Sequence, residues 1–233
     1  MSELFSKQTI AFLVENRLMN DKAWFEAHRE VYREDVIAPF AALVTALTPA
    51  MHKIDERFVM VPKVGGSISR VWRDTRFSKD KSLYRDTMWI SMIRQKGLML
   101  PEFFFAITPD NFMYGCGYYA AGSAGMNSLR EMILSGSEAF QAAFAMYNDQ
   151  DLFVLEGDMY KRSRHKDAPE ALRHWLDRKV ISLMRTSDDW DLLYSDRLAD
   201  TLAEQLTRIA PMYDLLIKAE ERAHNLEAAS RYT

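Results

Sequence analysis

The sequence predicts an α+β protein with a central, mostly antiparallel sheet flanked by N-terminal and C-terminal helices. Apolar residues recur at helical spacing near both ends of the chain. Between these regions, short apolar segments follow one another without helical segments between them, which favours an antiparallel meander over a doubly wound parallel sheet. Because the 233 residues contain no repeat, low-complexity tract or evident linker, one α+β domain over residues 1–233 is expected.

Capping residues and prolines mark the expected N-terminal helices. Ser6 and Asp21 each precede an apolar pattern, so we expect them as N-caps. Pro39 suits the first turn of a further helix, and Thr48-Pro49 is expected to end that helix. The stripe predicted to be buried on the first helix is Ile10, Leu13, Val14 and Leu18.

Five apolar segments are expected as strands. Their ranges are 58–61, 67–72, 88–93, 103–107 and 112–119. Gly65 and Gly66 are suited to a tight hairpin turn between the first two, since glycine adopts positive φ angles freely.

The second half of the chain is expected to be mostly helical. Asn127 and Ser137 are candidate N-caps, and Gly136 would end the helix that Asn127 begins. A helix from Asp167 or Pro169 would place Leu172, Leu176, Val180 and Leu183 inward. The last pattern begins at Ser195, and Pro211 is expected to kink or divide it.

Composition narrows the protein class. The net charge of −3 makes a dedicated nucleic-acid binder unlikely. Cys116 is the single cysteine, so no intrachain disulfide can form, and a cytoplasmic location is expected. The N-terminus lacks the pattern of a signal peptide, and no apolar run of about 18 residues is evident, so no membrane association is expected.

One segment stands out by its charge. Residues 70–86 contain six basic and three acidic residues, a balance of +3 in a chain whose total charge is −3. On an extended backbone, Arg70, Trp72, Asp74 and Arg76 would share one face, so that charged and apolar groups alternate in space. A charge buried there needs a partner.

Two functions compete for this segment. In one, the arginines grip the phosphate or carboxylate of a small anionic ligand. In the other, aspartates pair with the arginines and brace a long loop; a solvated surface is the third alternative. For the ligand site, Arg73 and Arg76 would bind charge and Asp74 would orient them or act as a base. The complete set of candidate ligand-binding residues is Arg73, Asp74, Arg76, Lys79, Lys81, Tyr84 and Lys161.

The same segment carries a family resemblance. Residues 73–82, Arg-Asp-Thr-Arg-Phe-Ser-Lys-Asp-Lys-Ser, resemble the hallmark of an uncharacterised family, the domain of unknown function numbered 2461. Weaker similarity extends to residues 24–26, 39–40 and 115–119, so the resemblance covers most of the chain. The chain has Leu83 where the family usually has proline, and Cys116 where it usually has glycine. The resemblance implies no activity.

Other motifs assign no reaction. The five histidines lack paired metal-ligand spacing, and no metal site is expected. Gly117 and Gly122 have the spacing of a mononucleotide loop, but its Lys-Ser/Thr is missing, and no cofactor is expected. Residues 161–166 form a second basic run, interpreted as a solvated loop or as a second wall of the anion site.

The leading hypothesis is therefore a small anionic ligand bound at the charged segment, with the question of an enzyme left open. The alternative is a non-catalytic module that meets nucleic acid or an acidic protein, or a purely structural charged motif. The sequence does not indicate an oligomeric state.

Overall fold

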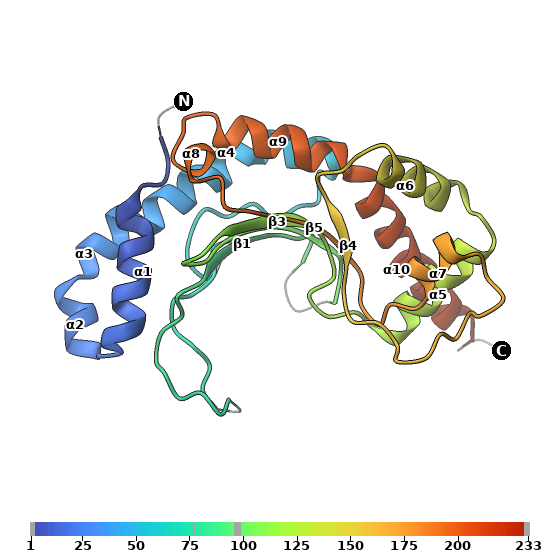
Figure 1. Ribbon diagram of the computed structural model, residues 1–233, viewed down its shortest axis with the longest axis horizontal. Coiled ribbons are helices and arrows are strands. Elements are labelled where there is room, and N and C mark those ends of the chain that lie inside the picture. The colour runs from blue at the N-terminus through green and yellow to red at the C-terminus, as the bar shows by residue number, and fades with distance from the viewer. Residues whose placement is uncertain (1–2, 77, 96–98, 231–233) are drawn as a thin grey trace. The chain divides into compact units, whose positions relative to one another are not determined.

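A computed structural model describes residues 3–76, 78–95 and 99–230, with the backbone alone described over residues 227–230. It confirms the α+β class, with helices before and after an antiparallel sheet (Figure 1). The helices of the N-terminal part are α1 (Lys7–Met19), α2 (Lys22–Ala27), α3 (Arg29–Val31), the π-helical segment η1 (Tyr32–Ile37) and α4 (Ala38–Ile54).

The described sheet has the strand order β1-β2-β3-β5-β4. Its strands are β1 (Met88–Met92), β2 (Glu102–Ile107), β3 (Phe112–Gly117), β4 (Val154–Glu156) and β5 (Ser182–Ser187). The remaining helices are α5 (Ser123–Leu134), α6 (Glu138–Asn148), α7 (Glu170–Leu176), α8 (Trp190–Leu193), α9 (Leu198–Arg208) and α10 (Ala210–Ser230).

The chain divides into two compact units. Unit 1 contains Met1–Met92, Phe104–Tyr114 and Thr186–Gln205, and unit 2 contains Ile93–Phe103, Gly115–Arg185 and Leu206–Thr233. The expectation of a single domain over residues 1–233 stays a prediction.

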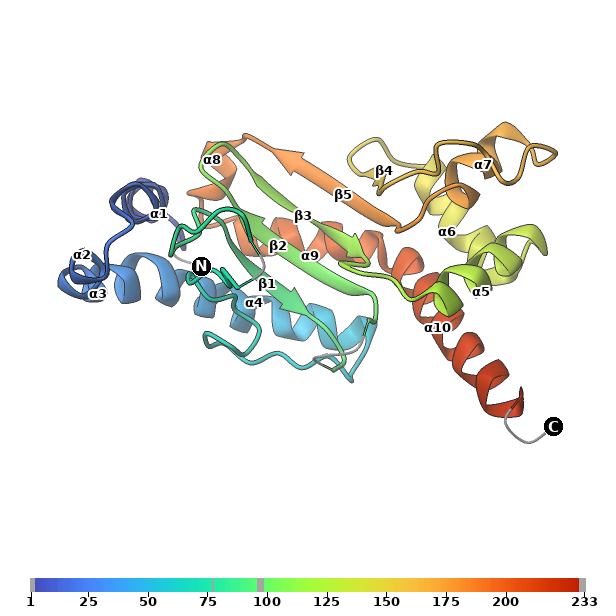
Figure 2. The same ribbon diagram turned by 90° about the horizontal axis from the view of Figure 1, so that it is seen from below.

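Unit 1 has a layered core. Figures 1 and 2 show α4 and α9 on the same face of the central strands. Phe40 of α4 and Phe105 of β2 are both fully buried, with ring centroids 6.2 Å apart, and Phe5 lies 5.0 Å from Phe40. Aromatic burial of this kind is the largest source of hydrophobic stabilisation in a core.

Unit 2 is mainly helical. Helix α10 packs against α5 and α6. Trp175 of α7 is 1% exposed, and its ring lies edge-on to Phe140 at 5.5 Å and to Tyr147 at 5.6 Å. Pro211 does separate α9 from α10, as the sequence predicts.

The first helix confirms its cap and corrects its buried stripe. Ser6 accepts a hydrogen bond from the amide of Gln8, and Asp21 caps α2 through the amide of Trp24. Leu18, predicted to be inward, is 77% exposed. The buried residues of α1 are Thr9, Phe12, Leu13 and Asn16. Because Thr9 and Asn16 are polar, the spacing of apolar residues in the sequence does not reveal this buried stripe. Thr9 tolerates burial because its hydroxyl donates a hydrogen bond to the carbonyl of Asp35 at 2.7 Å.

Three other helix boundaries differ from expectation. Pro49 lies inside α4 instead of ending it, because Leu47 and Met51 on either side are fully buried and tertiary packing outweighs the lost backbone bond. Helix α5 begins at Ser123, so Asn127 is an interior residue and not a cap. Helix α7 ends at Leu176, and Leu183 belongs to strand β5. The sequence predicts a helix there because Leu172, Leu176, Val180 and Leu183 recur at helical spacing.

The three strands predicted for the meander are confirmed, whereas the two predicted earlier in the chain are not formed. Strands β1, β2 and β3 match three expected segments, whereas residues 58–61 and 67–72 form only isolated bridges. Among the two glycines predicted to turn the chain, Gly65 alone has positive φ, at 74°.

One stretch in unit 1 passes a test that membrane-spanning helices also pass. Arg29–Ile54 is long and apolar enough to cross a membrane by length and composition, contrary to the expectation that no such run exists. Core helices of globular proteins pass the same test, and α4 buries Phe40, Leu43, Val44, Leu47 and Met51. The finding is weak evidence for a membrane segment in a fold that looks like a globular domain.

Candidate functional site

The charged motif is a loop closed at its base by backbone pairing. Trp72 and Tyr84 form an antiparallel bridge, and Ile68 pairs in the same sense with Ile90 of β1. The supporting bonds run from the amides of Arg73, Arg85, Ser69 and Ser91 to the carbonyls of Leu83, Val71, Trp89 and Ser67, respectively, at 2.8–2.9 Å. The backbone pairing therefore ends near Arg73, where the sequence predicts the end of a strand, and starts again near Leu83, although residues 67–72 form isolated bridges in place of that strand.

The two sides of this pairing have unequal lengths. Between the two bridges, five residues on one side, 68–72, are opposite seven on the other, 84–90. The two extra residues lie between Arg85 and Trp89, where they form a bulge. Bulges redirect neighbouring side chains, and here the Arg85 guanidinium lies 4.8 Å from the centre of the Trp89 ring.

Asp74 organises the outgoing side of the loop. Its carboxylate accepts from the amide of Arg76 at 3.1 Å, from Arg76 Nε at 3.0 Å and from Arg76 Nη2 at 2.7 Å. The hydrogen bonds from Arg76 hold the pKa of the Asp74 carboxyl at about 2, below the ordinary value of 3.8. The bond from the Arg76 amide to the Asp74 side chain forms a local turn, as aspartate side chains commonly do.

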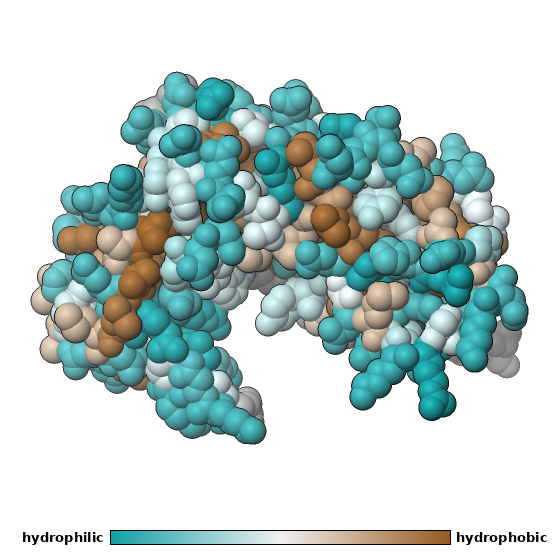
Figure 3. Space-filling model, viewed as in Figure 1, coloured by the Kyte–Doolittle hydropathy of each residue, from teal (hydrophilic) through white to brown (hydrophobic). Residues whose placement is uncertain are grey.

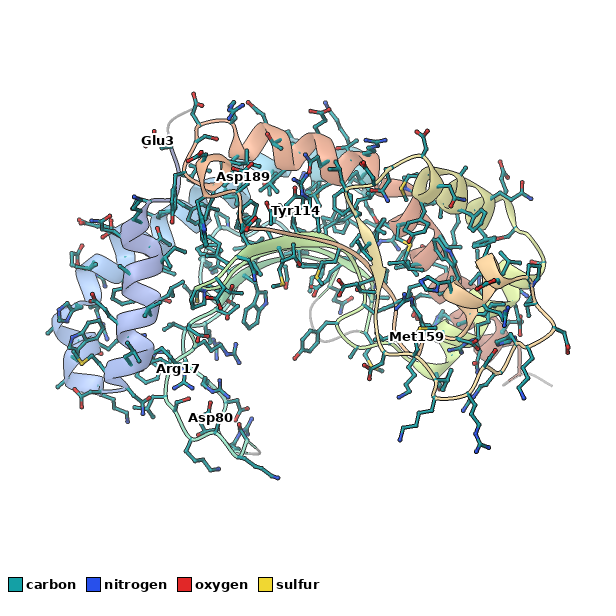
Figure 4. The ribbon with its side chains drawn as sticks, viewed as in Figure 1. Glu3, Arg17, Asp80, Tyr114, Met159 and Asp189 are labelled. Carbon is teal, nitrogen blue, oxygen red and sulfur yellow. The ribbon has the colours of Figure 1, made fainter. Side chains whose placement is uncertain are left out.

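Asp80 organises the returning side. Its carboxylate accepts from the amide of Ser82 at 2.9 Å and from the Ser82 hydroxyl at 2.7 Å. It also pairs with Arg17 of α1 at 3.0 Å and with Arg73 at 3.3 Å. Figure 4 labels Arg17 and Asp80, whose side chains face each other across the space between α1 and the loop. The two hydrogen bonds from Ser82 lower the pKa of the Asp80 carboxyl.

Tyr84 lies at the buried base of the loop. Its side chain is fully buried, and its ring centroid lies 4.5 Å from that of Trp72 and 5.2 Å from that of Phe25. Within the described residues its hydroxyl has no hydrogen-bond partner, and burial raises its pKa. Phe77, which alternation would place on the face of Val71, lies outside the described residues.

The loop borders a hollow of about 530 Å³ in unit 1. The residues that line it are Arg70, Trp72, Arg73, Asp74, Thr75, Arg76 and Arg85. Four arginines against one aspartate give this lining a formal charge of +3 (4 − 1). Figure 3 shows the projecting loop, at the lower left, as hydrophilic. Electropositive clefts of this kind attract and concentrate anions.

The arginines of the hollow differ in how far they are already satisfied. Arg76 is committed to Asp74, and Arg73 to Asp80. Arg70 and Arg85 have no hydrogen bond or ion pair to any residue that the structure describes. Their guanidinium donors are therefore available to a ligand.

None of the three predicted lysines is among the residues described as lining the hollow. The ammonium group of Lys81 donates to the carbonyl of Thr75 at 2.8 Å and thereby braces the loop, and Lys79 is exposed. Lys161 belongs to unit 2, where it is exposed on the second basic run. In that run the amide of Arg164 donates to Asp177, and its guanidinium lies 3.8 Å from the centre of the Tyr160 ring.

Sequence reasoning missed several residues of the site. Arg70 and Arg85 were counted in the charged segment but not selected, although their positions on either side of the motif could have indicated a facing pair. The amide of Leu83 donates a hydrogen bond to the Asn20 side chain at 2.6 Å. These two residues are 63 positions apart, so no local sequence pattern predicts the contact.

The glycine-rich strand has a structural explanation. A Cβ on Gly115 would lie 2.1 Å from the carbonyl oxygen of Leu183, and one on Gly117 would lie 2.4 Å from the Cα of Ser182. Both glycines therefore permit close contact between β3 and β5. Between them Cys116 is fully buried, and burial raises the pKa of its thiol. Across the described residues, no group of three or more His, Cys, Asp or Glu side chains is arranged to hold a metal ion.

Comparison with known proteins identifies the family. The comparison with curated proteins gave no match. The model of a family described as conserved hypothetical protein (DUF2461) matches residues 8–215, which include the motif loop and every residue lining its hollow. The chain belongs to this uncharacterised family, DUF2461.

Proposed function

We propose that the protein binds a small anionic ligand, bearing phosphate or carboxylate groups, in the hollow beside the motif loop. The observation that carries this proposal is the pair Arg70 and Arg85, which line an electropositive hollow and make no hydrogen bond or ion pair with any described residue, although Arg85 stacks on the Trp89 ring. Guanidinium groups bind phosphate and carboxylate through paired, charge-assisted hydrogen bonds.

The four arginines of the hollow have two different roles in this proposal. Arg70 and Arg85 supply free donors, while Arg73 and Arg76, already paired with aspartates, fix the loop and add positive potential. Trp72, 39% exposed, offers its ring to a planar part of the ligand.

The test is a titration of inorganic phosphate and pyrophosphate, followed by calorimetry and by thermal melting at constant ionic strength. A ligand that binds only the folded state raises the melting temperature as its concentration exceeds Kd. We expect pyrophosphate to stabilise the protein more than phosphate does, and sodium chloride at matched ionic strength to have no such effect.

Two substitutions locate the binding. Each of Arg70→Ala and Arg85→Ala should weaken pyrophosphate affinity about tenfold, because a hydrogen bond between charged groups contributes about 1.5–3 kcal/mol. Arg57→Ala is the matched control, since Arg57 lies in unit 1, pairs with Asp55 and does not line the hollow. Equal affinities for the wild type and both variants would refute the proposal.

An oligonucleotide forms the other arm of the experiment. Binding of single-stranded DNA that is tighter than that of pyrophosphate and falls steeply with salt would favour a nucleic-acid interaction module instead. We expect no such binding at physiological ionic strength.

A further inference from the structure

Unit 2 contains a second hollow, of about 590 Å³, unrelated to the motif loop. It is formed by residues that precede β2, by the N-cap and first turn of α5 and by residues 217–225 of α10. Helices α5 and α10 pack against each other and lie side by side in Figures 1 and 2.

The lining of this hollow has an apolar part and a polar part. Met99, Leu100, Ala124 and Ile217 supply hydrocarbon surface. The polar residues are Arg94, Glu220, Glu221, His224 and Asn225. A ligand that fills such a space needs a hydrocarbon body and one polar group.

Glu220 is the polar group without a complete set of partners. Its Oε1 atom is buried and accepts no hydrogen bond within the described residues. The carboxylate lies against α5, where a Cβ on Gly125 would displace Oε1. Among the described residues no basic side chain pairs with this carboxylate, so a cation in the hollow would stabilise its charged form.

Burial also acts on the ionisation of this carboxyl. It raises the pKa of Glu220, and an interaction with the Tyr118 hydroxyl opposes part of that rise. Tyr118 itself is 5% exposed, and its hydroxyl donates to the carbonyl of Leu216 at 3.3 Å.

The remaining charges of the hollow cancel. Arg94 pairs with Glu221 at 2.8 Å, and its guanidinium lies 5.8 Å from the centre of the Tyr213 ring. With His224 neutral, the formal charge of the lining is −1 (Arg94 +1, Glu220 −1, Glu221 −1). The carboxylate of Glu220 is therefore the charge left for a ligand to balance.

We propose that this hollow binds a small apolar amine, whose ammonium group pairs with the Glu220 carboxylate and whose hydrocarbon part contacts Met99, Leu100 and Ile217. A carboxylate only accepts hydrogen bonds, so the complementary ligand is a donor, and the uncompensated charge selects a cationic one. This binding is independent of the anion site in unit 1.

Hexylamine, hexanol and hexanoate share a hydrocarbon chain and differ in charge, so they make a matched set of probes. Binding to the full chain is measured by calorimetry near neutral pH. We expect hexylamine to bind at least tenfold more tightly than hexanol, and hexanoate to bind more weakly than both. Equal binding of hexylamine and hexanol, or no binding of hexylamine, would overturn the proposal.

Glu220→Gln should weaken hexylamine binding about tenfold while leaving hexanol binding unchanged. Glu131→Gln is the control, because Glu131 is also a unit 2 carboxylate but pairs with Arg222 outside the hollow. If Glu220→Gln prevents folding, Ile217→Ala provides the second measurement: it should weaken hexylamine and hexanol equally. Unchanged affinity in a folded Glu220→Gln variant would show that the carboxylate does not bind the amine.

Discussion

Arginine serves opposite purposes in the two units. In unit 2, Arg178 is 5% exposed and donates to three carbonyls, those of Leu155 at 2.6 Å, Gly157 at 2.8 Å and His174 at 3.1 Å. In unit 1, Arg70 and Arg85 border an open hollow and make no hydrogen bond or ion pair with any described residue. A guanidinium surrounded by backbone acceptors holds a fold together, whereas one with unused donors at a surface hollow is available for binding.

The largest expected effect concerns Arg178, the arginine that stabilises the fold of unit 2. Arg178→Met should destabilise the protein by about 3 kcal/mol, because it leaves buried carbonyls without donors. Urea unfolding measures the loss. Arg162→Met, at an exposed position of the same unit, is the control and should change stability by less than about 0.5 kcal/mol. Pyrophosphate affinity should be unchanged in folded Arg178→Met; if it falls, the two classes of arginine are not separate.

The next prediction separates two arginines within the hollow. Arg73→Ala should cost about 1 kcal/mol of stability, since Arg73 is half-buried and pairs with Asp80. Arg76→Ala should cost less, because the Arg76 side chain is 76% exposed. Thermal melts of both variants, with and without pyrophosphate, measure stability and binding together. A greater loss of stability for Arg76→Ala would reverse the assignment of Arg73 as the brace.

Neutralising Asp74 should strengthen binding. Asp74→Asn removes the one negative charge of the lining and releases the Arg76 guanidinium, so pyrophosphate should bind severalfold more tightly. Asp74→Ala is a second variant that gives the same charge change without an amide. Weaker binding in both would mean that Asp74 positions the ligand instead of competing with it.

Asp74 also predicts an acid response. Its folded pKa of about 2 lies below the ordinary value of 3.8, so its stabilising effect is complete above pH 3.8 and is lost as the pH falls towards 2. Acid titration of thermal stability should therefore show a smaller loss over that interval in Asp74→Asn than in the wild type. Identical curves would contradict an ion pair between Asp74 and Arg76 in solution.

The last prediction concerns the attachment of the loop to α1. Asn20 has a φ of 49°, and its side chain accepts the amide of Leu83. Asn20→Gly keeps the left-handed backbone and loses the hydrogen bond, at a cost of about 1 kcal/mol. Asn20→Ala adds left-handed strain of about 1–2 kcal/mol. Equal melting temperatures for the two variants would exclude a backbone contribution at this position.

Local signals predicted the parts of the fold that depend on local structure. The caps Ser6 and Asp21 and the meander from β1 to β3 are confirmed, and the backbone pairing ends near Arg73 as expected, although no strand forms before it. Strand β5 was missed because its leucine spacing continues that of α7, and helix or strand is decided there by pairing with distant segments.

The candidate site shows the same division. The sequence located the charged motif, but the hollow depends on a bulge and on pairing between segments that no local period reveals. Tyr84 was selected with the charged residues around it, yet the fold buries its ring against Phe25, a residue that lies 59 positions earlier.

The contact between Asn20 and Leu83 has a consequence for how relatives of this chain vary. A proline at position 83 has no amide hydrogen to donate, so a relative with proline there would leave the side chain at position 20 without this partner. The backbone requirement at position 20 would persist, and glycine meets it at least as well as asparagine. Position 20 is therefore expected to carry asparagine when position 83 can donate, and to shift towards glycine when it cannot. An alignment of family members would test this covariation between positions 20 and 83, which a single hydrogen bond would cause.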